Sequence, residues 1–341
     1  MESFLIVRLS SLGDIIHTLP AFSLLRQNFP KTKIFWVTQA KASQILELVP
    51  GIDEIIVIEP NLFFKALALR NKKIDLSFDF QGLLKSALVA FLSGAKKRFG
   101  FNRQNLKEPL AHLFYTDKLP AIKEFDHHVI YKNLKLLELI GLKIDWNPAS
   151  LTFPLAIPKE ITEKTKLKLT EIGLVENKPL IIFNVGASWE SKRLPTSFWI
   201  ETINLVKKEM QDSFNLALLW GNQEELTLAK NIHEKTKIYL LPFLDLKETI
   251  ALISIISLLV SGDTFALQVA SALNTSVVGL FGPTSPIRNG PFRPNDVYIY
   301  SSINCSPCYR RRCSQPRCWQ AISPQRVVSA IINRVKRDDS N

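Results

Sequence analysis

Short apolar runs alternate with longer amphipathic stretches along most of the chain. The run at residues 4–7 predicts a buried strand. The stretch at residues 15–28 predicts a helix, because Ile15, Leu19 and Phe22 recur at helical spacing. Buried strands separated by helices are typical of parallel sheets that are covered on both faces.

The same alternation continues through both halves of the chain. The predicted strands lie at residues 4–7, 34–37, 55–58, 76–79, 97–101, 180–184, 215–220, 258–261 and 277–281. The predicted helices lie at residues 15–28, 41–49, 62–70, 83–92, 127–141, 196–210, 224–235, 245–255, 265–273 and 325–335. Ser323 followed by Pro324 is a favourable start for the last of these helices.

The pattern stops after residue 141, crosses a proline-bearing region at 148–158 and restarts at residue 180. It therefore predicts two doubly wound, Rossmann-like α/β domains, residues 1–165 and 166–341, with a linker near residues 155–175. Ligands of open α/β sheets bind beyond the carboxyl ends of the strands. We therefore expect two such sheets to face a central cleft, with an acceptor on one domain and a donor on the other.

Composition supports a globular protein without membrane spans. The chain has 341 residues, of which 46% are hydrophobic, enough for two domains with their own cores. We find no apolar run of about 18 residues that would predict a transmembrane helix. The first residues include Glu2 and a predicted strand, which is unlike a signal peptide, so we expect a cytoplasmic protein.

The formal net charge of +12 narrows the classes of partner. The basic residues are spread along the chain, without the cation and aromatic pattern of a single-stranded nucleic-acid groove. The densest cluster is Arg310, Arg311 and Arg312. We therefore expect an anionic membrane surface or a phosphorylated lipid, and no nucleic acid. A generally basic surface without a partner is the plainer alternative.

The turn after the first predicted strand is the first candidate site. It holds Ser10, Ser11, Gly13 and Asp14. Gly13 allows a substrate to approach the backbone, and the Asp14 carboxylate can take a proton from an acceptor hydroxyl. The local pattern leaves open a plainer interpretation, in which Asp14 or Ser11 only caps the following helix.

The loop at residues 184–193 is the second candidate site, because it follows the first predicted strand of the second half. The Ser188 hydroxyl can donate a hydrogen bond, and Lys192 and Arg193 supply positive charge for a phosphate. A solvated loop with ordinary surface cations is the alternative.

Asp263 and Thr264 form the third candidate site, between a predicted strand and the predicted helix at 265–273. The free N–H groups at the start of that helix suit a diphosphate. Residues 282–284 end the next strand and would line the same region. Asp263 or Thr264 serving only as an N-cap is the alternative here. No G-x-G-x-x-G follows residues 4–7 or 180–184, which counts against a nicotinamide dehydrogenase.

All four cysteines lie in one short segment, at Cys305, Cys308, Cys313 and Cys318. Disulfides are disfavoured in a cytoplasmic protein, whereas four thiolates can bind zinc tetrahedrally. The gaps after the first pair are shorter than the usual separation of two zinc-binding pairs. Four reduced thiols in a compact loop therefore stay open as the alternative.

Six segments together resemble the lipopolysaccharide heptosyltransferases of glycosyltransferase family 9. They are VRLSSLGDIIHTLPA at residues 7–21, DFQGLLKSALVAFLSGAKKRFGF at 79–101, NVGASWESKRLP at 184–195, LLWGNQEE at 218–225, SGDTFALQVASALNTSVVGLFGPTSPIRNGPF at 261–292 and CSPCYRRRC at 305–313. The resemblance runs in order over nearly the whole chain. It implies a GT-B fold and inverting transfer of heptose from an ADP-sugar to a lipopolysaccharide core acceptor, without a catalytic metal or other cofactor.

The resemblance also implies roles for single residues. Asp14 matches the proposed general base, and Lys192 matches a lysine on the donor phosphates. The expected donor-binding residues are Ser188, Lys192, Arg193, Gln223, Asp263, Thr264 and Gln268. The expected acceptor-binding residues are Ser10, Ser11, Gly13 and His17. The lipid-linked acceptor implies a cytoplasmic protein associated peripherally with the inner membrane.

Two positions depart from the family pattern. Phe265 stands where the family usually has glycine, which adds bulk where a diphosphate approaches the backbone. Gln268 stands where histidine is usual and cannot carry charge. A family member that uses another nucleotide sugar and a non-catalytic GT-B protein are therefore the alternative functions. The donor, the acceptor position and the oligomeric state are not fixed by the sequence.

Overall fold

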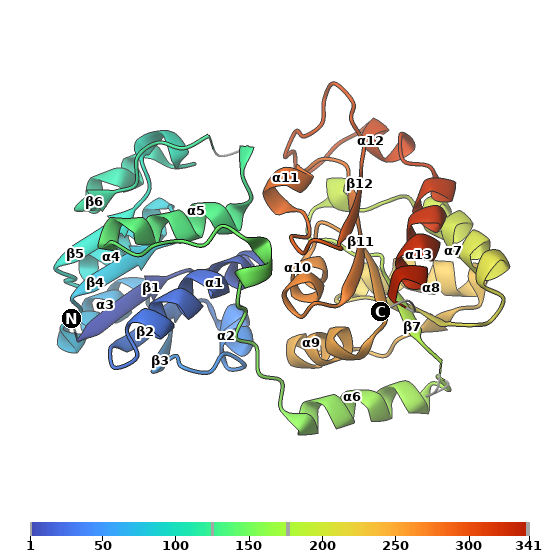
Figure 1. Cartoon of the computed structure of the whole chain (residues 1–341), viewed down its shortest axis with the longest axis horizontal. Helices are drawn as coiled ribbons and strands as arrows, with labels where there is room; N and C mark the ends of the chain where they lie inside the picture. Colours follow the sequence, from blue (N-terminus) through green and yellow to red (C-terminus); the bar gives the residue numbers. More distant parts are fainter. Residues whose placement is uncertain (1, 124–125, 175–177, 339–341) are drawn as a thin grey trace. The chain divides into compact units, whose positions relative to one another are not determined.

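A computed structural model describes residues 2–123, 126–174 and 178–338, without the side chains of residues 337 and 338. The chain divides into two compact units, Met1–Ala156 and Ile157–Asn341. Each unit contains one six-stranded sheet whose strands are all parallel, flanked by helices (Figure 1). The predicted pair of doubly wound α/β domains is confirmed.

The sheet of the first unit has the strand order β3-β2-β1-β4-β5-β6. Its strands are β1 (Ser3–Val7), β2 (Lys33–Thr38), β3 (Glu54–Val57), β4 (Leu76–Asp79), β5 (Lys97–Gly100) and β6 (Asp117–Lys118). The α-helices are α1 (Leu12–Asn28), α2 (Ala40–Leu46), α3 (Leu62–Ala68), α4 (Leu84–Leu92) and α5 (Val129–Leu136). Short 3₁₀ helices include η1 (Leu69–Lys72), η2 (Arg103–Asn105), η3 (Pro109–Phe114), η5 (Leu137–Ile140) and η6 (Pro148–Ser150).

Alternate residues of the strands face opposite helix layers in this unit. Leu5 belongs to one buried cluster with Ala66 of α3 and Val89 of α4. On the other side, the rings of Phe22 in α1 and Trp36 in β2 lie 5.8 Å apart. Helices α3 and α4 therefore cover one face of the sheet, and α1 covers the other.

The sheet of the second unit has the order β12-β11-β10-β7-β8-β9. Its strands are β7 (Leu180–Asn184), β8 (Asn215–Leu219), β9 (Tyr239–Leu240), β10 (Leu258–Gly262), β11 (Ser276–Phe281) and β12 (Val297–Tyr300). Its helices are α6 (Lys159–Glu171), η7 (Glu190–Lys192), α7 (Thr196–Met210), α8 (Gln223–Thr236), α9 (Leu246–Ile255), α10 (Phe265–Ala272), α11 (Pro286–Asn289), α12 (Arg317–Gln320) and α13 (Pro324–Asp338).

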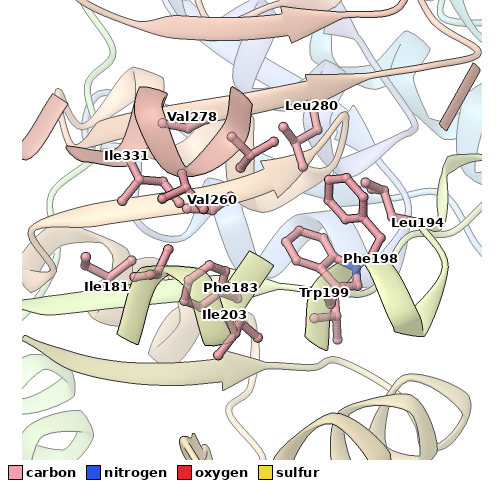
Figure 2. Packing of buried hydrophobic residues seen from close by; sticks show 14 of the residues in the cluster. Ile181, Phe183, Leu194, Phe198, Trp199, Ile203, Val260, Val278, Leu280 and Ile331 are labelled. Carbon is pink, nitrogen blue, oxygen red and sulfur yellow. The ribbon is translucent and has the colours of Figure 1, made fainter. Parts of the chain in front are cut away.

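The core of the second unit forms where α7 and α13 pack on one face of the sheet. Figure 2 shows Trp199 and Ile203 of α7, Ile331 of α13 and Val260 of β10 in this cluster. Trp199 is 1% exposed, and the other three are fully buried. These apolar contacts hold the strands whose carboxyl ends carry the candidate donor loops.

All nine strands predicted from the apolar runs are present, with ends that shift by one residue or none. The three strands that were not predicted are β6, β9 and β12, which lie at sheet edges. Two of them have only two residues, too few to show a period. Helix α6 occupies most of the predicted linker. No helix in the described part of the chain is long and apolar enough to cross a membrane.

Candidate functional site

The turn from β1 into α1 holds the Asp14 carboxylate in a fixed position. Ser11 is the N-cap of α1, and Asp14 lies in its first turn. Oδ2 of Asp14 accepts hydrogen bonds from the Ser11 N–H at 3.1 Å and from its hydroxyl at 2.9 Å. Asp14 therefore does cap the helix, as the plainer interpretation of the sequence expected, but it also has a second, stronger partner.

That partner is Arg8, the residue directly after β1. Its Nη2 lies 2.8 Å from Oδ1 of Asp14, and the two side chains are 8% and 29% exposed. Partial burial acts to raise the pKa of Asp14, but the Arg8 guanidinium and the hydrogen bonds outweigh it and hold the pKa well below its usual value. The ion pair with Arg8 therefore favours the ionised form of the carboxylate.

The neighbouring strand β4 fixes this turn from the other side. Arg8 donates through Nη1 to the carbonyl of Phe80. Oε1 of Gln81 accepts a hydrogen bond from the Leu9 N–H at 2.7 Å. Val7 and Asp79 are register partners in β1 and β4, so residues from the two strand ends meet at one place. Arg8 and Gln81 thus hold the candidate site in place, and the sequence analysis did not single them out.

The expected acceptor-binding residues differ in accessibility. Ser11 is exposed, and Ser10 and Gly13 are partly exposed. His17 is 2% exposed and its ring packs edge-on against His128, with centroids 5.3 Å apart. His17 therefore belongs to the packing beneath the turn and not to an acceptor-binding surface, because burial keeps its ring from a sugar. Its Nδ1 lies 3.9 Å from Oδ1 of Asp14.

In the second unit, β7 and β10 are adjacent strands, and their ends share a hydrogen-bond network. Nδ2 of Asn184 donates to the hydroxyl oxygens of Ser261 and Thr264, each at 2.9 Å. The Ser261 and Thr264 hydroxyls lie 2.9 Å apart. Thr264 is the N-cap of α10, so this network fixes where α10 begins. The free N–H groups of the first turn of α10 consequently stand at the end of β10.

Lys192 reaches the same place from the loop after β7. Its Nζ lies 2.7 Å from Oδ2 of Asp263 and donates to the Asp263 carbonyl at 3.2 Å. It also lies 4.4 Å from the centre of the Trp189 ring. The exposed fractions of the two charged side chains are 13% and 7%. The structure thus joins the second and third candidate sites into one, with a cation beside the start of α10.

Three other expected donor-binding residues lie along the same loop and the start of α8. Arg193 donates to the Ala187 carbonyl at 2.9 Å and pairs with Glu224 at 2.9 Å. Ser188 is exposed in the loop. Gln223, the first residue of α8, is also exposed. Arg193 therefore connects the β7 loop to the residue that follows Gln223.

Gln268 does not lie on the donor surface. It is 1% exposed, and its Nε2 donates to the Asn289 carbonyl at 2.8 Å. The side chain therefore anchors α11 to α10, and the expectation that it binds a donor directly disagrees with its burial. Phe265, the other departure from the family pattern, is partly exposed at the first position of α10.

The cysteine-rich segment supports both donor loops. The Ser191 hydroxyl donates to the Arg310 carbonyl at 2.5 Å, and the Ser191 carbonyl accepts from Nε1 of Trp319 at 2.8 Å. The N–H groups of Cys308 and Tyr309 donate to the Pro283 carbonyl at 3.0 and 2.9 Å. Residues 305–319 therefore hold the loop of Lys192 and the turn at 282–284 in one arrangement.

Close packing leaves room only for a glycine at position 282. A Cβ on Gly282 would come within 2.9 Å of the Trp319 ring and 3.0 Å of the Cys318 sulfur.

Tyr309 lies near Asp263, and burial raises the pKa of its phenol, with the Asp263 carboxylate acting in the same direction. The sequence analysis did not single out Tyr309 or Trp319.

The four cysteines are free thiols, and all of them line one small cavity beside Ser191 and Pro283. Burial raises the pKa of the Cys318 thiol, and Cys308 and Cys305 add to that shift. Among the described residues, no three His, Cys, Asp or Glu side chains are placed to hold a metal ion. The four thiols therefore share one cavity, without three of them arranged as metal ligands in the described structure.

Known proteins resemble this chain over most of its length. The model of glycosyltransferase family 9 (heptosyltransferase) matches residues 64–318. Lipopolysaccharide heptosyltransferase 1 of Campylobacter coli is 30% identical, with 85% of this chain and 86% of that protein covered. The Pseudomonas aeruginosa protein of the same name is 26% identical, with 96% of each chain covered.

Solved structures share the fold. A glycosyl transferase family 9 protein from Veillonella parvula has a TM-score of 0.80 at 19% identity, with 98% of this chain and 97% of that chain covered. The E. coli heptosyltransferase WaaC, solved with ADP, has a TM-score of 0.73 at 24% identity, with 98% of each chain covered. These likenesses show a GT-B heptosyltransferase fold.

Proposed function

Since this chain belongs to glycosyltransferase family 9, the heptosyltransferase family, we propose that it transfers a heptose from an ADP-sugar to a lipopolysaccharide core acceptor. The family match supports the reaction class, which is glycosyl transfer. Relatives named lipopolysaccharide heptosyltransferase 1 support the substrates, because they align with 96% and 85% of this chain.

Asp14 is the base in this proposal. An acceptor hydroxyl attacks the anomeric carbon from the face opposite the diphosphate, and the bond from that carbon to the diphosphate oxygen breaks. Configuration is therefore inverted. The hydroxyl becomes acidic as its new bond to carbon forms, so a carboxylate held ionised by Arg8 can take the proton late in the reaction. Ser10, Ser11 and Gly13 present the surface beside Asp14 on which the acceptor would lie.

The second unit stabilises the leaving diphosphate. Negative charge grows on that group as the bond breaks, and Lys192 and the first turn of α10 offset it electrostatically. Asp263 and Thr264 orient these groups, because Asp263 holds the ammonium and Thr264 ties the start of the helix to Asn184 and Ser261. Ser188, Arg193 and Gln223 lie where they can contact the remainder of the donor. These cations and dipoles take the place of a divalent metal in this mechanism.

One observation favours a second donor. Phe265 adds a partly exposed ring at the first position of α10, where glycine is usual in the family. The bulky side chain there changes how closely a diphosphate approaches the backbone, and it suits a family member that uses another nucleotide sugar. Release of nucleoside diphosphate from a panel of sugar nucleotides decides between them. Preference for ADP-heptose supports ADP-heptose as the donor. Preference for another sugar nucleotide would make that compound the donor instead.

The lipid-linked acceptor places the protein at a membrane surface in this proposal, on the cytoplasmic side of the inner membrane. The basic surface is consistent with anionic lipid, given the net charge of +12. Arg310, Arg311 and Arg312 are exposed, although the carbonyls of the first two hold Ser191. Vesicle sedimentation with the three arginines neutralised tests whether their side chains contribute.

A further inference from the structure

We propose that α3, α4 and η3 of the first unit form a docking face that inserts into the surface of an anionic lipid bilayer. This inference rests on the proposed function, because a lipid-linked acceptor requires the enzyme to work at a membrane. Its evidence is separate and comes from exposed apolar side chains and charge. The docking face consists of Phe63, Phe64, Leu67, Leu84, Phe91, Leu110 and Leu113.

These side chains are concentrated to an unusual degree. In the described part of the chain, 13 large apolar side chains are exposed, and seven of them lie on these three elements. Phe64 is 73% exposed, and Leu113 is 67% exposed. Single exposed apolar residues are common on soluble proteins, but a contiguous group of this kind marks an interaction surface.

The three elements lie side by side, so the exposed residues form one surface. Helix α3 packs on α4, and α4 packs on η3. The rings of Phe91 in α4 and Phe114 in η3 have centroids 5.5 Å apart. The N–H of Leu84, at the start of α4, donates to the Glu108 carboxylate next to η3 at 2.6 Å.

The exposure does not come from loose packing of the helices. Ala66 of α3 and Val89 of α4 are fully buried against the sheet. Phe63 and Leu67 lie one helical turn apart on the outer side of α3 and are 52% and 36% exposed. Helix α3 is thus apolar on both its inner and outer sides, whereas a helix that faces water carries polar residues outside.

The excess of positive charge around the docking face indicates an anionic partner. Residues 62–114 contain ten Lys and Arg residues and three Asp and Glu residues. The three acidic groups are already engaged, since Asp79 is buried, Asp75 pairs with Lys96 at 2.6 Å and Glu108 accepts from the Leu84 N–H. The exposed cations on or next to the face are Arg70, Lys72, Lys73, Lys85, Lys96, Lys97, Arg103 and Lys107. Three of them pair with carboxylates, Lys72 with Glu54, Lys85 with Glu59 and Lys96 with Asp75, so the positive charge offered to a partner comes mainly from the other five.

Apolar side chains bordered by cations fit the interface of an anionic bilayer. The rings and leucines enter the boundary between headgroups and acyl chains, and the cations meet lipid phosphates. A second copy of the chain fits this face poorly. In a symmetric dimer each basic border would meet the same basic border of its partner, and like charges would oppose each other.

The test is sedimentation of the full-length protein with vesicles of phosphatidylcholine alone or mixed with phosphatidylglycerol. We expect binding to the mixed vesicles, weakened by salt. The paired change Phe63→Ser and Phe64→Ser, and separately Leu110→Ser and Leu113→Ser, should each weaken it at least ~10-fold. Phe243→Ser is the matched control, since Phe243 is 54% exposed in the second unit, and it should bind as the wild type does.

Release of ADP from ADP-heptose with a water-soluble core acceptor separates this inference from the proposed function. The docking variants should keep that activity, because none of the changed residues lies in the candidate site. Wild-type protein that fails to bind the mixed vesicles, or docking variants that bind them equally well, would overturn the docking face even if soluble transfer is intact. A wild-type dimer that dissociates in the docking variants would assign the face to self-association and also overturn it.

Discussion

Arg8 and Asp14 form an ion pair across the turn that joins β1 to α1, with Nη2 and Oδ1 2.8 Å apart. Arg8 also donates to the Phe80 carbonyl directly after β4, so the sheet fixes the position of the guanidinium that pairs with the carboxylate. The proposed base is therefore preorganised in position and in charge. Its low pKa makes it a weak base in the resting enzyme, suited to accepting a proton late in bond formation.

Asp14→Ala should lower kcat by at least ~10²-fold, because the acceptor hydroxyl loses its proton acceptor. The free energy of unfolding should fall by more than the ~1 kcal/mol of a lost helix cap, because the nearly buried Arg8 guanidinium also loses its carboxylate partner. Steady-state kinetics and urea unfolding measure the two quantities. Asp53→Ala removes another arginine-paired carboxylate of the first unit and serves as the control. Near wild-type turnover of Asp14→Ala would leave Asp14 as a helix cap alone.

Arg8→Met should move the acidic limb of the pH profile of kcat/KM to higher pH. Arg8 lowers the pKa of Asp14, so removing the guanidinium raises that pKa, and protonation then removes the base at a higher pH. In the wild type the ion pair should stabilise the fold above the ordinary carboxyl pKa of 3.8 and lose that effect as the pH falls further. Arg26→Met, which breaks the pair with Asp53, is the control. Identical acidic limbs for wild type and Arg8→Met would contradict the role of Arg8.

Lys192→Met should raise the apparent KM for the donor much more than that for the acceptor, because its charge is directed at the diphosphate. It should also destabilise the second unit, since it leaves the Asp263 carboxylate buried without its partner. Adding Asp263→Asn should recover most of the stability but not the donor affinity. Thermal unfolding and kinetics on both variants separate the two effects. Full recovery of donor use in the double variant would make Lys192 a structural residue only.

Trp319→Phe should raise the donor KM several-fold without changing the acceptor KM. The change removes the hydrogen bond from Nε1 to the Ser191 carbonyl, which holds the loop of Lys192, at a cost of about 1 kcal/mol in stability. Trp146→Phe, a half-exposed tryptophan of the first unit, controls for loss of the indole. Unchanged donor kinetics would show that the cysteine-rich segment does not position Lys192.

The sequence predicted strands such as β1 and β2 well, because each has four buried apolar residues in a row, which carry a clear signal. Two-residue edge strands such as Tyr239–Leu240 are too short to show a hydrophobic pattern. Candidate loops were predictable from their place after strands. Their partners were not, because Gln81 meets Leu9 only through the order in which β1 and β4 pair.

The burial of two expected binding residues was not predicted from the sequence. His17 and Gln268 lie within motifs that resemble the family's, yet both side chains are nearly inaccessible. A motif shows which residue types occur and not which side of a helix they face. The link from Trp319 to Ser191 spans 128 residues, so no local pattern could reveal that the cysteine-rich segment supports the donor loop.

The most direct test of the central claim is to incubate the purified protein with ADP-heptose and a lipopolysaccharide core acceptor in the presence of EDTA, and to determine the product by mass and by NMR at its new anomeric carbon. Our account predicts a product heavier by one heptose residue, with the anomeric configuration opposite to that of the donor, formed at the same rate with and without EDTA. A product of retained configuration, activity that requires added magnesium or manganese, or no heptose transfer at all would contradict it.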